Sequence, residues 1–422
     1  MASLYNIAIY LYTGLIILLS PFHKKAGLWY RGRKGFFSRW ENFDPGRRRV
    51  IWFHCASLGE FEQGRPVIEK IKEKDRDVFI LLTFFSPSGY EIRKDYSLAG
   101  AVCYLPADTP ANARKFISVF RPEIAVFVKY EFWHNYISVL SAAGIPLYLI
   151  SANFRENQPF FRWYGKWFGK MLHRFSHIFV QGESSLELLR SVGVTRASVA
   201  GDTRFDRVHA IVRSRSEIPL ASAFSQGSFT IVAGSTWPAD EELLARFVRE
   251  AGHRVKLIIA PHEIGEDRIG GLETRFGNRA IRYSNAGPSV PSGPSGLSGT
   301  TVLIIDNIGL LSSLYHYGDI AYIGGGFGKG IHNVLEACTY GIPVIFGPNY
   351  RKFREARELT GLGAAFPVNN YDDFDAVASE LITGPGKLTA AGRKAKDYVK
   401  KNLGASDIIV DKVLSSHMHS GG

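Results

Sequence analysis

Residues 50–74, VIWFHCASLGEFEQGRPVIEKIKEK, set the architecture of the first half of the chain. The apolar run over residues 50–53 is typical of a strand that is buried on both faces. The small residues Ala56 and Ser57 interrupt this run, and a helical pattern of apolar and charged residues follows them. A single carboxylate, Glu60, lies between the two patterns. The stretch therefore predicts a strand–turn–helix unit that presents a glutamate where the strand ends.

Similar strands alternate with helical patterns along the rest of the chain, in two series. The first series comprises VIWFHC, VFILLTFF, EIAVFVK, PLYLISA and HIFVQG, between residues 50 and 182. The second comprises FTIVAGS, VKLIIAPH, TVLIIDN, IAYIGGG and PVIFGP, between residues 229 and 348. Continuous apolar strands separated by helices are typical of parallel sheets. The pattern predicts an α/β chain of two Rossmann-like domains that face each other across a cleft, with ligands at the carboxyl ends of the strands.

The two series give the expected domain boundaries. We expect an N-terminal domain over residues 23–210, a charged connection over residues 211–226 and a C-terminal domain over residues 227–422. The last helices of the second domain are free to return to the first. A length of 422 residues fits two domains of ordinary size. The Pro/Gly/Ser-rich stretch over residues 284–299 predicts a surface loop and not a boundary.

The net charge limits the kinds of partner that the protein can have, and the cysteine content indicates its environment. The formal net charge of +12 indicates an acidic partner, which is nucleic acid, an anionic membrane or a phosphorylated substrate. The three cysteines, Cys55, Cys103 and Cys338, are far apart and form no CxxC pair. Their spacing argues against a disulfide framework and a zinc site, so we expect a reduced, cytosolic environment.

The N-terminus carries the strongest membrane signal. The segment LYNIAIYLYTGLIILLSPF, residues 4–22, has no charged side chain and is long enough to span a bilayer. The basic stretch that follows it, HKKAGLWYRGRKGFFSRW, is expected to remain cytoplasmic and to contact anionic headgroups. We therefore expect residues 1–22 to be a membrane anchor, whether spanning or lying in the interface. The alternative is a buried core helix, because Asn6 and three tyrosines dilute the apolar character.

A glycine-rich loop marks a candidate anion site in the second half. Residues 319–337, DIAYIGGGFGKGIHNVLEA, lead from a strand through Gly325 and Gly326 into a helical pattern. Glycines allow backbone amides to approach a ligand closely, and a helix N-terminus favours phosphate. Glu336 is placed to accept hydrogen bonds from sugar hydroxyls. The alternative is that Asn333 and Glu336 form a capping box.

Two neighbouring loops are expected to point to the same site. AGSTWPADEE, residues 233–242, predicts a strand end followed by an exposed helix N-terminus at Ser235 or Thr236. IIAPHE places His262 after another strand, where a hydrogen-bonded structural histidine is an equal alternative.

The chain resembles one family over almost its whole length, the 3-deoxy-D-manno-octulosonic acid (Kdo) transferases of lipopolysaccharide synthesis. The shared motifs are HCASLGEFEQGRPVIE, LTFFSPSGYE, FVQGES, the Gly234-Ser235-Thr236 turn, the glycine-rich loop with His332-Asn333 and Glu336, and FGPNYRKFREA. The resemblance implies a GT-B fold, CMP-Kdo as donor, a lipid A precursor of the lipid IVA type as acceptor, and attachment to the cytoplasmic face of the inner membrane. It also implies transfer with inversion, with no metal and no other cofactor.

The resemblance assigns roles to individual residues. Glu60, in the Ala-Ser-x-Gly-Glu motif, matches the proposed general base; the alternative is a glutamate that only complements the helix dipole. Glu131 matches a second glutamate that contacts Kdo or orients the base. We expect Ser86, Ser88 and Gly89 to line the acceptor side, with a simple turn as an equal alternative, and Arg155 to pair with a substrate phosphate or carboxylate. The matching donor residues are Ser235, Thr236, His262, Ile308, Gly309, Gly325, Gly326, Asn333 and Glu336. The chain departs from the family at Pro261-His262-Glu263, where Pro-Arg-His is usual, and at Leu310, where an acidic residue is usual.

Two other functions fit parts of the sequence. A different GT-B enzyme acting on a UDP-linked sugar would use the glycine-rich loop and Glu336, but it would not need the Ala-Ser-Leu-Gly-Glu motif or the anchor. A non-enzymatic basic protein on a membrane surface or on nucleic acid would cluster its cations on one domain face. Much of the positive charge instead lies beside residues 4–22, where lipid accounts for it, so we expect no nucleic-acid partner.

Overall fold

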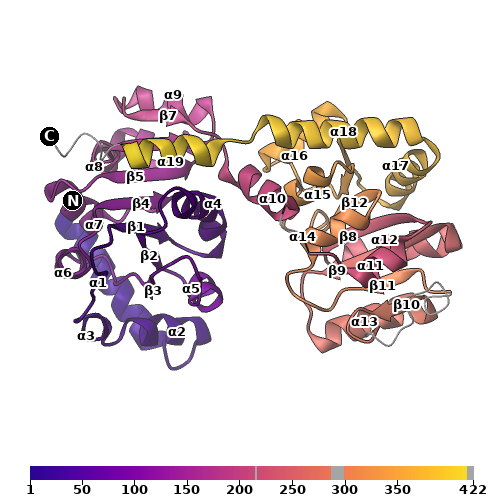
Figure 1. Cartoon of the computed structure of the whole chain (residues 1–422), viewed down its shortest axis with the longest axis horizontal. Coiled ribbons are helices and arrows are strands. Elements are labelled where there is room, and N and C mark those ends of the chain that lie inside the picture. The colour runs from indigo at the N-terminus through magenta and orange to yellow at the C-terminus, as the bar shows by residue number, and fades with distance from the viewer. Residues whose placement is uncertain (214–215, 287–298, 416–422) are drawn as a thin grey trace. The chain divides into compact units, whose positions relative to one another are not determined.

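The computed structural model describes residues 1–213, 216–286 and 299–415, which form two compact α/β units (Figure 1). The N-terminal unit comprises Met1–Arg207 and the last helix of the chain, and the C-terminal unit comprises Val208–Asn402. Most of the Pro/Gly/Ser-rich loop expected at residues 284–299 lies outside the described residues.

The N-terminal unit is built on a seven-stranded parallel sheet in the order β3-β2-β1-β4-β5-β6-β7. The strands are β1 (Val50–Cys55), β2 (Phe79–Phe84), β3 (Ala101–Tyr104), β4 (Ile124–Val128), β5 (Leu147–Ala152), β6 (His177–Val180) and β7 (Ala197–Val199). Every residue of β1 is buried. Trp52 packs into the core on one face of the sheet, and Phe53 packs into the core on the other. Because successive side chains point to opposite faces, a strand covered on both faces must be apolar throughout.

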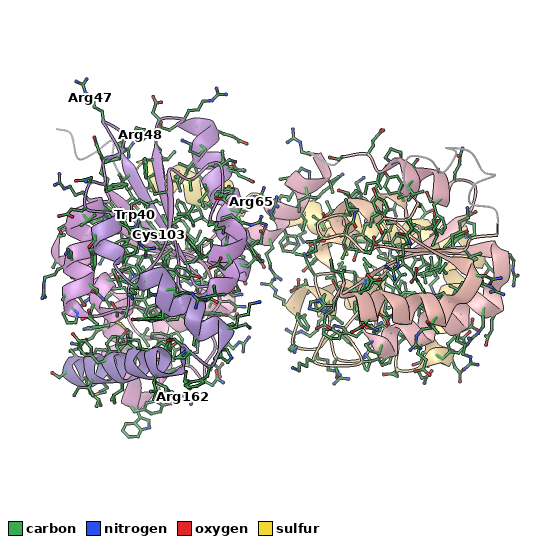
Figure 2. The ribbon with its side chains drawn as sticks, turned by 90° about the horizontal axis from the view of Figure 1, so that it is seen from below. Trp40, Arg47, Arg48, Arg65, Cys103 and Arg162 are labelled. Carbon is green, nitrogen blue, oxygen red and sulfur yellow. The ribbon has the colours of Figure 1, made fainter. Side chains whose placement is uncertain are left out.

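Helices cover this sheet and cross between its strands. They are α4 (Leu58–Lys74), α5 (Pro87–Arg93), α6 (Pro110–Phe120), α7 (His134–Ala142), α8 (Lys166–Leu172) and α9 (Glu183–Ser191). Ser57 caps α4 by accepting the N–H of Gly59 at 3.2 Å. Figure 2 shows Cys103 inside this unit, while Arg47 projects from its surface. All three cysteines are free and buried.

Three helices precede the sheet, α1 (Ala2–Leu19), α2 (Lys24–Arg33) and α3 (Phe36–Arg39). Among the described residues, α1 is the one helix long and apolar enough to cross a bilayer, and none of its residues is buried. Arg33 ties α2 to the sheet, because its guanidinium donates to Leu105 O at 2.7 Å and to Phe85 O at 2.8 Å. The same guanidinium lies 3.8 Å from the ring centroid of Trp29. The basic segment after α1 is therefore folded onto the domain.

The C-terminal unit has a second seven-stranded parallel sheet, in the order β10-β11-β9-β8-β12-β13-β14. Its strands are β8 (Phe229–Thr236), β9 (Val255–Pro261), β10 (Ala280–Arg282), β11 (Val302–Ile304), β12 (Ile320–Ile323), β13 (Val344–Phe346) and β14 (Ala365–Pro367). Its helices are α11 (Pro219–Ser225), α12 (Pro238–Ala251), α13 (Glu266–Phe276), α14 (Leu311–Leu314), α15 (Leu335–Tyr340), α16 (Arg354–Leu362), α17 (Tyr371–Thr383) and α18 (Pro385–Lys401). The two wholly parallel sheets confirm the predicted α/β class.

The chain passes between the units twice. Helix α10 (Thr203–Arg213) carries it out of the N-terminal unit. The stretch over residues 211–226, expected as a connection, contains α11, whose Ala221 and Phe224 are fully buried. The final helix, α19 (Ala405–Ser415), lies on the N-terminal unit, where it is drawn in yellow in Figure 1.

The contacts of α19 show how firmly it belongs to the N-terminal unit. Ile409 and Val410 share a core with Phe53 of β1, and each fully buried aliphatic side chain contributes about 1.5–3 kcal/mol. Asp206 accepts the backbone N–H groups of Gly404 at 2.8 Å and Ser406 at 2.7 Å, which fixes the start of the helix.

The strand order places both predicted sites at topological switch points. In each sheet the order reverses beside the first strand, between β1 and β4 in one unit and between β8 and β12 in the other. Ligands of open parallel sheets bind outside the carboxyl ends of the strands at these reversals. Glu60 and Glu131 follow β1 and β4, whereas Thr236 ends β8 and the glycine-rich loop follows β12.

Candidate active site

Glu60 is presented by the first turn of α4, directly after β1. The Oγ of Ser57 donates to its carboxylate oxygen Oε2, and the side chain is half-buried. Because the first turn carries the positive end of the helix dipole, an ionised carboxylate is favoured there. Glu60 therefore has a structural role at the helix start, and its partly exposed carboxylate lies on the first turn after β1, the strand beside the switch point of the sheet.

The turn predicted to bind the acceptor packs against the Glu60 turn. The N–H of Ser86 donates to Ala56 O at 2.7 Å, and the Oγ of Ser86 caps α5 by accepting the N–H of Ser88 at 3.3 Å. A Cβ at Gly89 would lie 2.2 Å from the Phe84 ring, so this position requires glycine for packing. The structure thus brings the two turns together and gives Ser86 and Gly89 local structural roles.

Glu131 follows β4 and lies in a buried network that the sequence did not reveal. Its Oε2 accepts the indole N–H of Trp133 at 2.6 Å and lies 3.1 Å from Nε2 of His54. His54 is fully buried and Glu131 is 6% exposed. The position of His54 at the end of β1, beside the Ala-Ser-Leu-Gly-Glu motif, is the signal that could have identified it. Lys129, two residues before Glu131, has a φ of +72°, a conformation that is uncommon outside glycine and concentrates at functional sites.

The charges of these carboxylates act on groups at the ends of β1 and β4. Burial raises the pKa of the Cys55 thiol, and the charges of Glu60 and Glu131 raise it further. Burial also raises the pKa of Tyr130, Glu60 adds to this effect, and Arg155 opposes it. Arg155 is exposed in the segment after β5. The predicted residues of the N-terminal domain thus lie around one end of its sheet.

The glycine-rich loop of the C-terminal unit is packed closely against its neighbours. A Cβ at Gly324 would lie 2.3 Å from Ser235 O, and a Cβ at Gly326 would lie 2.5 Å from Gly347 N. Gly325 has a φ of +88°, and its Cβ would lie 2.6 Å from Gly330 O. Close backbone packing therefore requires glycine at these positions. The approach of a ligand to their amides would be a second, separate reason for glycine.

The helix after this loop differs from the expected one. Helix α15 has six residues, and its N-cap is Val334 and not Asn333. Asn333 instead accepts the N–H of Leu335 at 3.1 Å and donates from Nδ2 to Glu336 at 2.9 Å. Because the glycine turn leaves residues 331–334 irregular, little helix dipole is available to an anion. The loop amides, and not a long helix, form this part of the candidate donor site.

Asp240 connects the glycine-rich loop to the end of β8. Its buried carboxylate accepts the Tyr322 hydroxyl at 2.8 Å, the Trp237 N–H at 2.8 Å and the Gly325 N–H at 2.9 Å. Trp237 is the N-cap of α12, so the helix starts later than Ser235 or Thr236. The sequence signal for Asp240 was its place three residues after this cap.

His262 belongs to a ring stack beside this loop. Its ring lies 4.8 Å from that of Trp237 and 4.5 Å from that of His332, centroid to centroid and nearly parallel. The Trp237 indole N–H donates to His332 Nε2 at 3.2 Å. Burial, aided by the His262 charge, lowers the pKa of His332. The predicted His262 is thus an exposed residue whose ring stacks with two neighbouring rings.

The remaining donor residues lie around the same strand ends. Ser235 has a φ of +54°. Thr236 is buried, and its hydroxyl donates to Oε1 of Glu241 at 3.0 Å. Ile308 and Gly309 form an exposed turn after β11. Burial, followed by the charge of Glu336, raises the pKa of Tyr315, whose hydroxyl lies beside Gly234. Within the described ranges, no three His, Cys, Asp or Glu side chains gather as ligands for a metal ion.

Comparison with structures of known proteins identifies the fold. The UDP-GlcNAc 2-epimerase of Neisseria meningitidis superposes with a TM-score of 0.60 at 16% identity, covering 87% of this chain and 100% of the other. MurG of Acinetobacter baumannii superposes with a TM-score of 0.55 at 12% identity, covering 87% of this chain and 99% of the other. At such identities the likeness concerns the fold alone, and that fold is GT-B.

Comparison of sequences identifies the family. The family model described as 3-deoxy-D-manno-octulosonic-acid transferase (kdotransferase) matches residues 30–207. The 3-deoxy-D-manno-octulosonic acid transferase of Aquifex aeolicus is 30% identical over 342 residues, which cover 79% of this chain and 86% of that protein. The enzyme of the same name from Bordetella pertussis is 25% identical over 415 residues, which cover 91% of this chain and 94% of that protein. The chain therefore belongs to the 3-deoxy-D-manno-octulosonic acid transferase family, glycosyltransferases of lipopolysaccharide synthesis.

Proposed function

We propose that this chain transfers Kdo from CMP-Kdo to a lipid A precursor of the lipid IVA type, with inversion at the anomeric carbon. Glu60 is the general base. The observation that carries the proposal is the place of Glu60, a half-buried carboxylate in the turn after β1, at the switch point of the N-terminal sheet.

The reaction needs one proton acceptor. Glu60 removes the proton of the acceptor hydroxyl while that oxygen forms a bond to the anomeric carbon. The bond between this carbon and the phosphate oxygen breaks on the opposite face, and its electron pair leaves with CMP. Ser57, which donates to Oε2 of Glu60, orients the carboxylate for this step.

Glu131 assists from the neighbouring strand end. Its Oε2 is held by the Trp133 indole and lies against His54, so the orientation of the carboxylate is fixed. We assign to it either contact with the Kdo unit or orientation of the base. Ser86, Ser88, Gly89 and Arg155 contribute the acceptor side, and Arg155 supplies a cation for an acceptor phosphate or carboxylate.

The C-terminal domain binds the donor. The amides of Gly324, Gly325, Gly328 and Gly330 donate within the protein and shape the glycine-rich loop. The other amides of this loop and of the β8 turn receive the phosphate of CMP, with His262 beside them, and Glu336 accepts from ribose hydroxyls. Ser235, Thr236, Ile308, Gly309 and Asn333 complete the donor contacts. Because the amides are already oriented by the fold, they stabilise the leaving phosphate without reorganisation. The proposal requires no metal and no other cofactor.

The acceptor explains the membrane features. Leu11, Leu15 and Leu18 of α1 are exposed, and the cations of α2 and α3 follow them along the chain. An apolar helix face flanked by cations binds an anionic interface. We place the protein on the cytoplasmic face of the inner membrane, where the lipid acceptor lies.

One assay tests this proposal. Purified protein is mixed with CMP-Kdo and lipid IVA in detergent, and products are counted by mass spectrometry, with CMP or UDP added as competitor. We expect a Kdo-bearing lipid and inhibition by CMP. Inhibition by UDP alone, with turnover of a UDP-sugar, would instead identify a different GT-B activity, and vesicle binding without turnover of either donor would identify a non-enzymatic protein.

A further inference from the structure

Helix α1 is attached to the N-terminal domain along one face. Its partly buried residues are Tyr5, Asn6, Ile9, Thr13 and Ile16, and the C-cap Ser20 is partly buried as well. These positions recur every three or four residues and therefore share one side of the helix. Leu4 and Leu11, on other sides, are 63% and 70% exposed. The helix thus has a docked face and an apolar free face.

The docked face makes a buried polar contact through Tyr5. The Tyr5 hydroxyl donates to Oδ2 of Asp108 at 2.7 Å, and Asp108 is 1% exposed. The same carboxylate accepts the N–H of Asn135 at 3.0 Å through Oδ2 and the N–H of Tyr136 at 3.0 Å through Oδ1. These are among the first amides of α7, which otherwise has no side-chain cap of its own. Asp108 therefore caps α7, and Tyr5 completes that cap.

Neighbouring contacts join α1 to the same turn of α7. Asn6 accepts from the side-chain amide of Asn135 at 2.9 Å. The Tyr5 ring lies edge-on to His134, with ring centroids 5.5 Å apart. Burial raises the pKa of Asp108, while the Tyr5 hydroxyl and the two α7 amides act to lower it. The buried carboxylate thus depends on its donors, of which Tyr5 is one.

The turn that α1 holds leads directly to Glu131. Trp133, the N-cap of α7, donates its indole N–H to Glu131, and residues 130–133 form neither helix nor strand. We infer that Tyr5 is a positioning residue: it completes the α7 cap and thereby fixes the segment that holds Glu131, so that α1 serves the active site as well as the membrane. This inference rests on the proposed role of Glu131.

Three variants separate the two roles of α1. Tyr5→Phe removes the hydroxyl and keeps the ring, Tyr10→Phe makes the same change at a 57% exposed tyrosine, and Leu11→Glu places a charge on the free face. Each full-length variant is compared with the wild type in three ways. The measurements are amide hydrogen exchange of residues 129–142, binding to vesicles of phosphatidylethanolamine and phosphatidylglycerol, and kcat and KM with detergent-solubilised acceptor.

We expect Tyr5→Phe to accelerate exchange at the Asn135 and Tyr136 amides about tenfold, because a charged buried acceptor loses one of its donors. Its kcat should fall about tenfold at unchanged KM for CMP-Kdo, and its vesicle binding should be unchanged. Leu11→Glu should show the reverse, with weaker vesicle binding and unchanged exchange and kcat in detergent. Tyr10→Phe should match the wild type.

Unchanged exchange at α7 in Tyr5→Phe would overturn the inference, and so would a loss of activity confined to vesicle-bound acceptor. If Tyr5→Phe unfolds globally, the variant Asn6→Ala is used in its place. We expect it to accelerate amide exchange at Asn135, and an unchanged exchange rate would contradict the inference. Exchange is measured without substrate. A wild type that fails to transfer Kdo would therefore overturn the proposed function and leave this structural result standing.

Discussion

His54 and Glu131 are 77 residues apart in the chain, yet Nε2 of His54 lies 3.1 Å from Oε2 of Glu131. The proton arrangement follows from the neighbours. The Trp52 indole, which can only donate, gives its N–H to Thr83 Oγ1 at 2.8 Å. Oγ1 of Thr83 lies 2.9 Å from His54 Nδ1 and 3.4 Å from Phe53 O, and the Trp133 indole N–H lies 3.0 Å from His54 Nε2 and 2.6 Å from Glu131 Oε2. We assign the hydrogen of His54 to Nε2, because an ionised carboxylate only accepts and a bare ring nitrogen would repel it. With this tautomer, Glu131 receives N–H donors from His54 and from Trp133.

Replacing His54 tests this arrangement. We expect His54→Leu to lower kcat about 10- to 100-fold, because Glu131 loses a donor to its charged oxygen. The KM for CMP-Kdo should be unchanged, and His54→Gln, which retains an N–H donor, should recover part of the activity. His177→Gln is the matched control, since that histidine lies in β6 and is hydrogen-bonded to Ser198. Equal losses in both glutamine variants would show that the effect is not specific to Glu131.

Replacing Glu60 tests the assignment of the base. Glu60→Gln should keep the fold and the binding of CMP but lower the rate of transfer by about 10²–10⁴. Glu69→Gln, on the same helix and paired with Arg65, serves as control. Rates are measured in single turnovers, and CMP binding is measured by calorimetry. Near-normal turnover of Glu60→Gln would remove Glu60 from the mechanism and leave it only the role at the start of α4.

Two glycines of one loop provide a test of the donor site. Gly325→Ala forces a side chain into a φ of +88° and toward Gly330 O, so it should weaken CMP-Kdo binding by about tenfold or more. The φ of Gly328 is not left-handed, and a Cβ at this position would lie 3.7 Å from Gly325 O, an ordinary contact distance. Gly328→Ala should therefore bind the donor normally. Equal affinities of the two variants in donor titrations would contradict a donor site at this loop.

The ion pairs of Glu62 predict how the free energy of unfolding depends on pH. Its carboxylate accepts from Arg93 at 2.8 Å and from Arg207 at 3.0 Å. Burial acts to raise the pKa of Glu62, but the two arginines outweigh it and hold that pKa below its usual value. Because the folded pKa is depressed, the stabilisation is present above the unfolded pKa of about 4.3 and is lost as pH falls through the folded pKa.

We therefore expect Glu62→Gln to lower the free energy of unfolding of the N-terminal domain by about 1–2 kcal/mol at pH 7. The difference from the wild type should shrink as the pH is lowered toward 3.5. Glu73→Gln, at an exposed position of the same helix, is the control. A difference that is constant over this range of pH, measured by denaturant unfolding, would contradict the ion-pair explanation.

The interior strands could be predicted from the sequence, but the edges of the sheets could not. The ten predicted strands are central ones, buried on both faces, and their apolar runs are continuous. The four others, β3, β7, β10 and β14, are the outermost strands of the two sheets. They have three or four residues, and β7 and β10 are only partly buried throughout. A short strand with one neighbour needs no continuous apolar run, so no pattern marks it.

The same distinction applies to the site. Glu60 and the glycine-rich loop were predicted as site residues because their neighbours in sequence carry the signal. The contact of Glu131 with His54 was not predicted, because His54 reaches it only through the pairing of β1 with β4. The contact of Tyr5 with Asp108 spans 103 residues, and on sequence alone residues 4–22 would be treated as an anchor that the site does not need. Contacts at such separations follow from topology, which local patterns do not contain.

The return of α19 to the N-terminal unit reverses the order in which the two domains can be completed during synthesis. A nascent chain that has emerged to residue 402 carries every strand and helix of the second unit, while Phe53 and its neighbours still lack Ile409, Val410 and Val413. The domain that leaves the ribosome first is therefore the last to be closed. Until α19 emerges, the apolar surface of the N-terminal domain that this helix covers stays exposed, where chaperones can bind it and where it can cause aggregation.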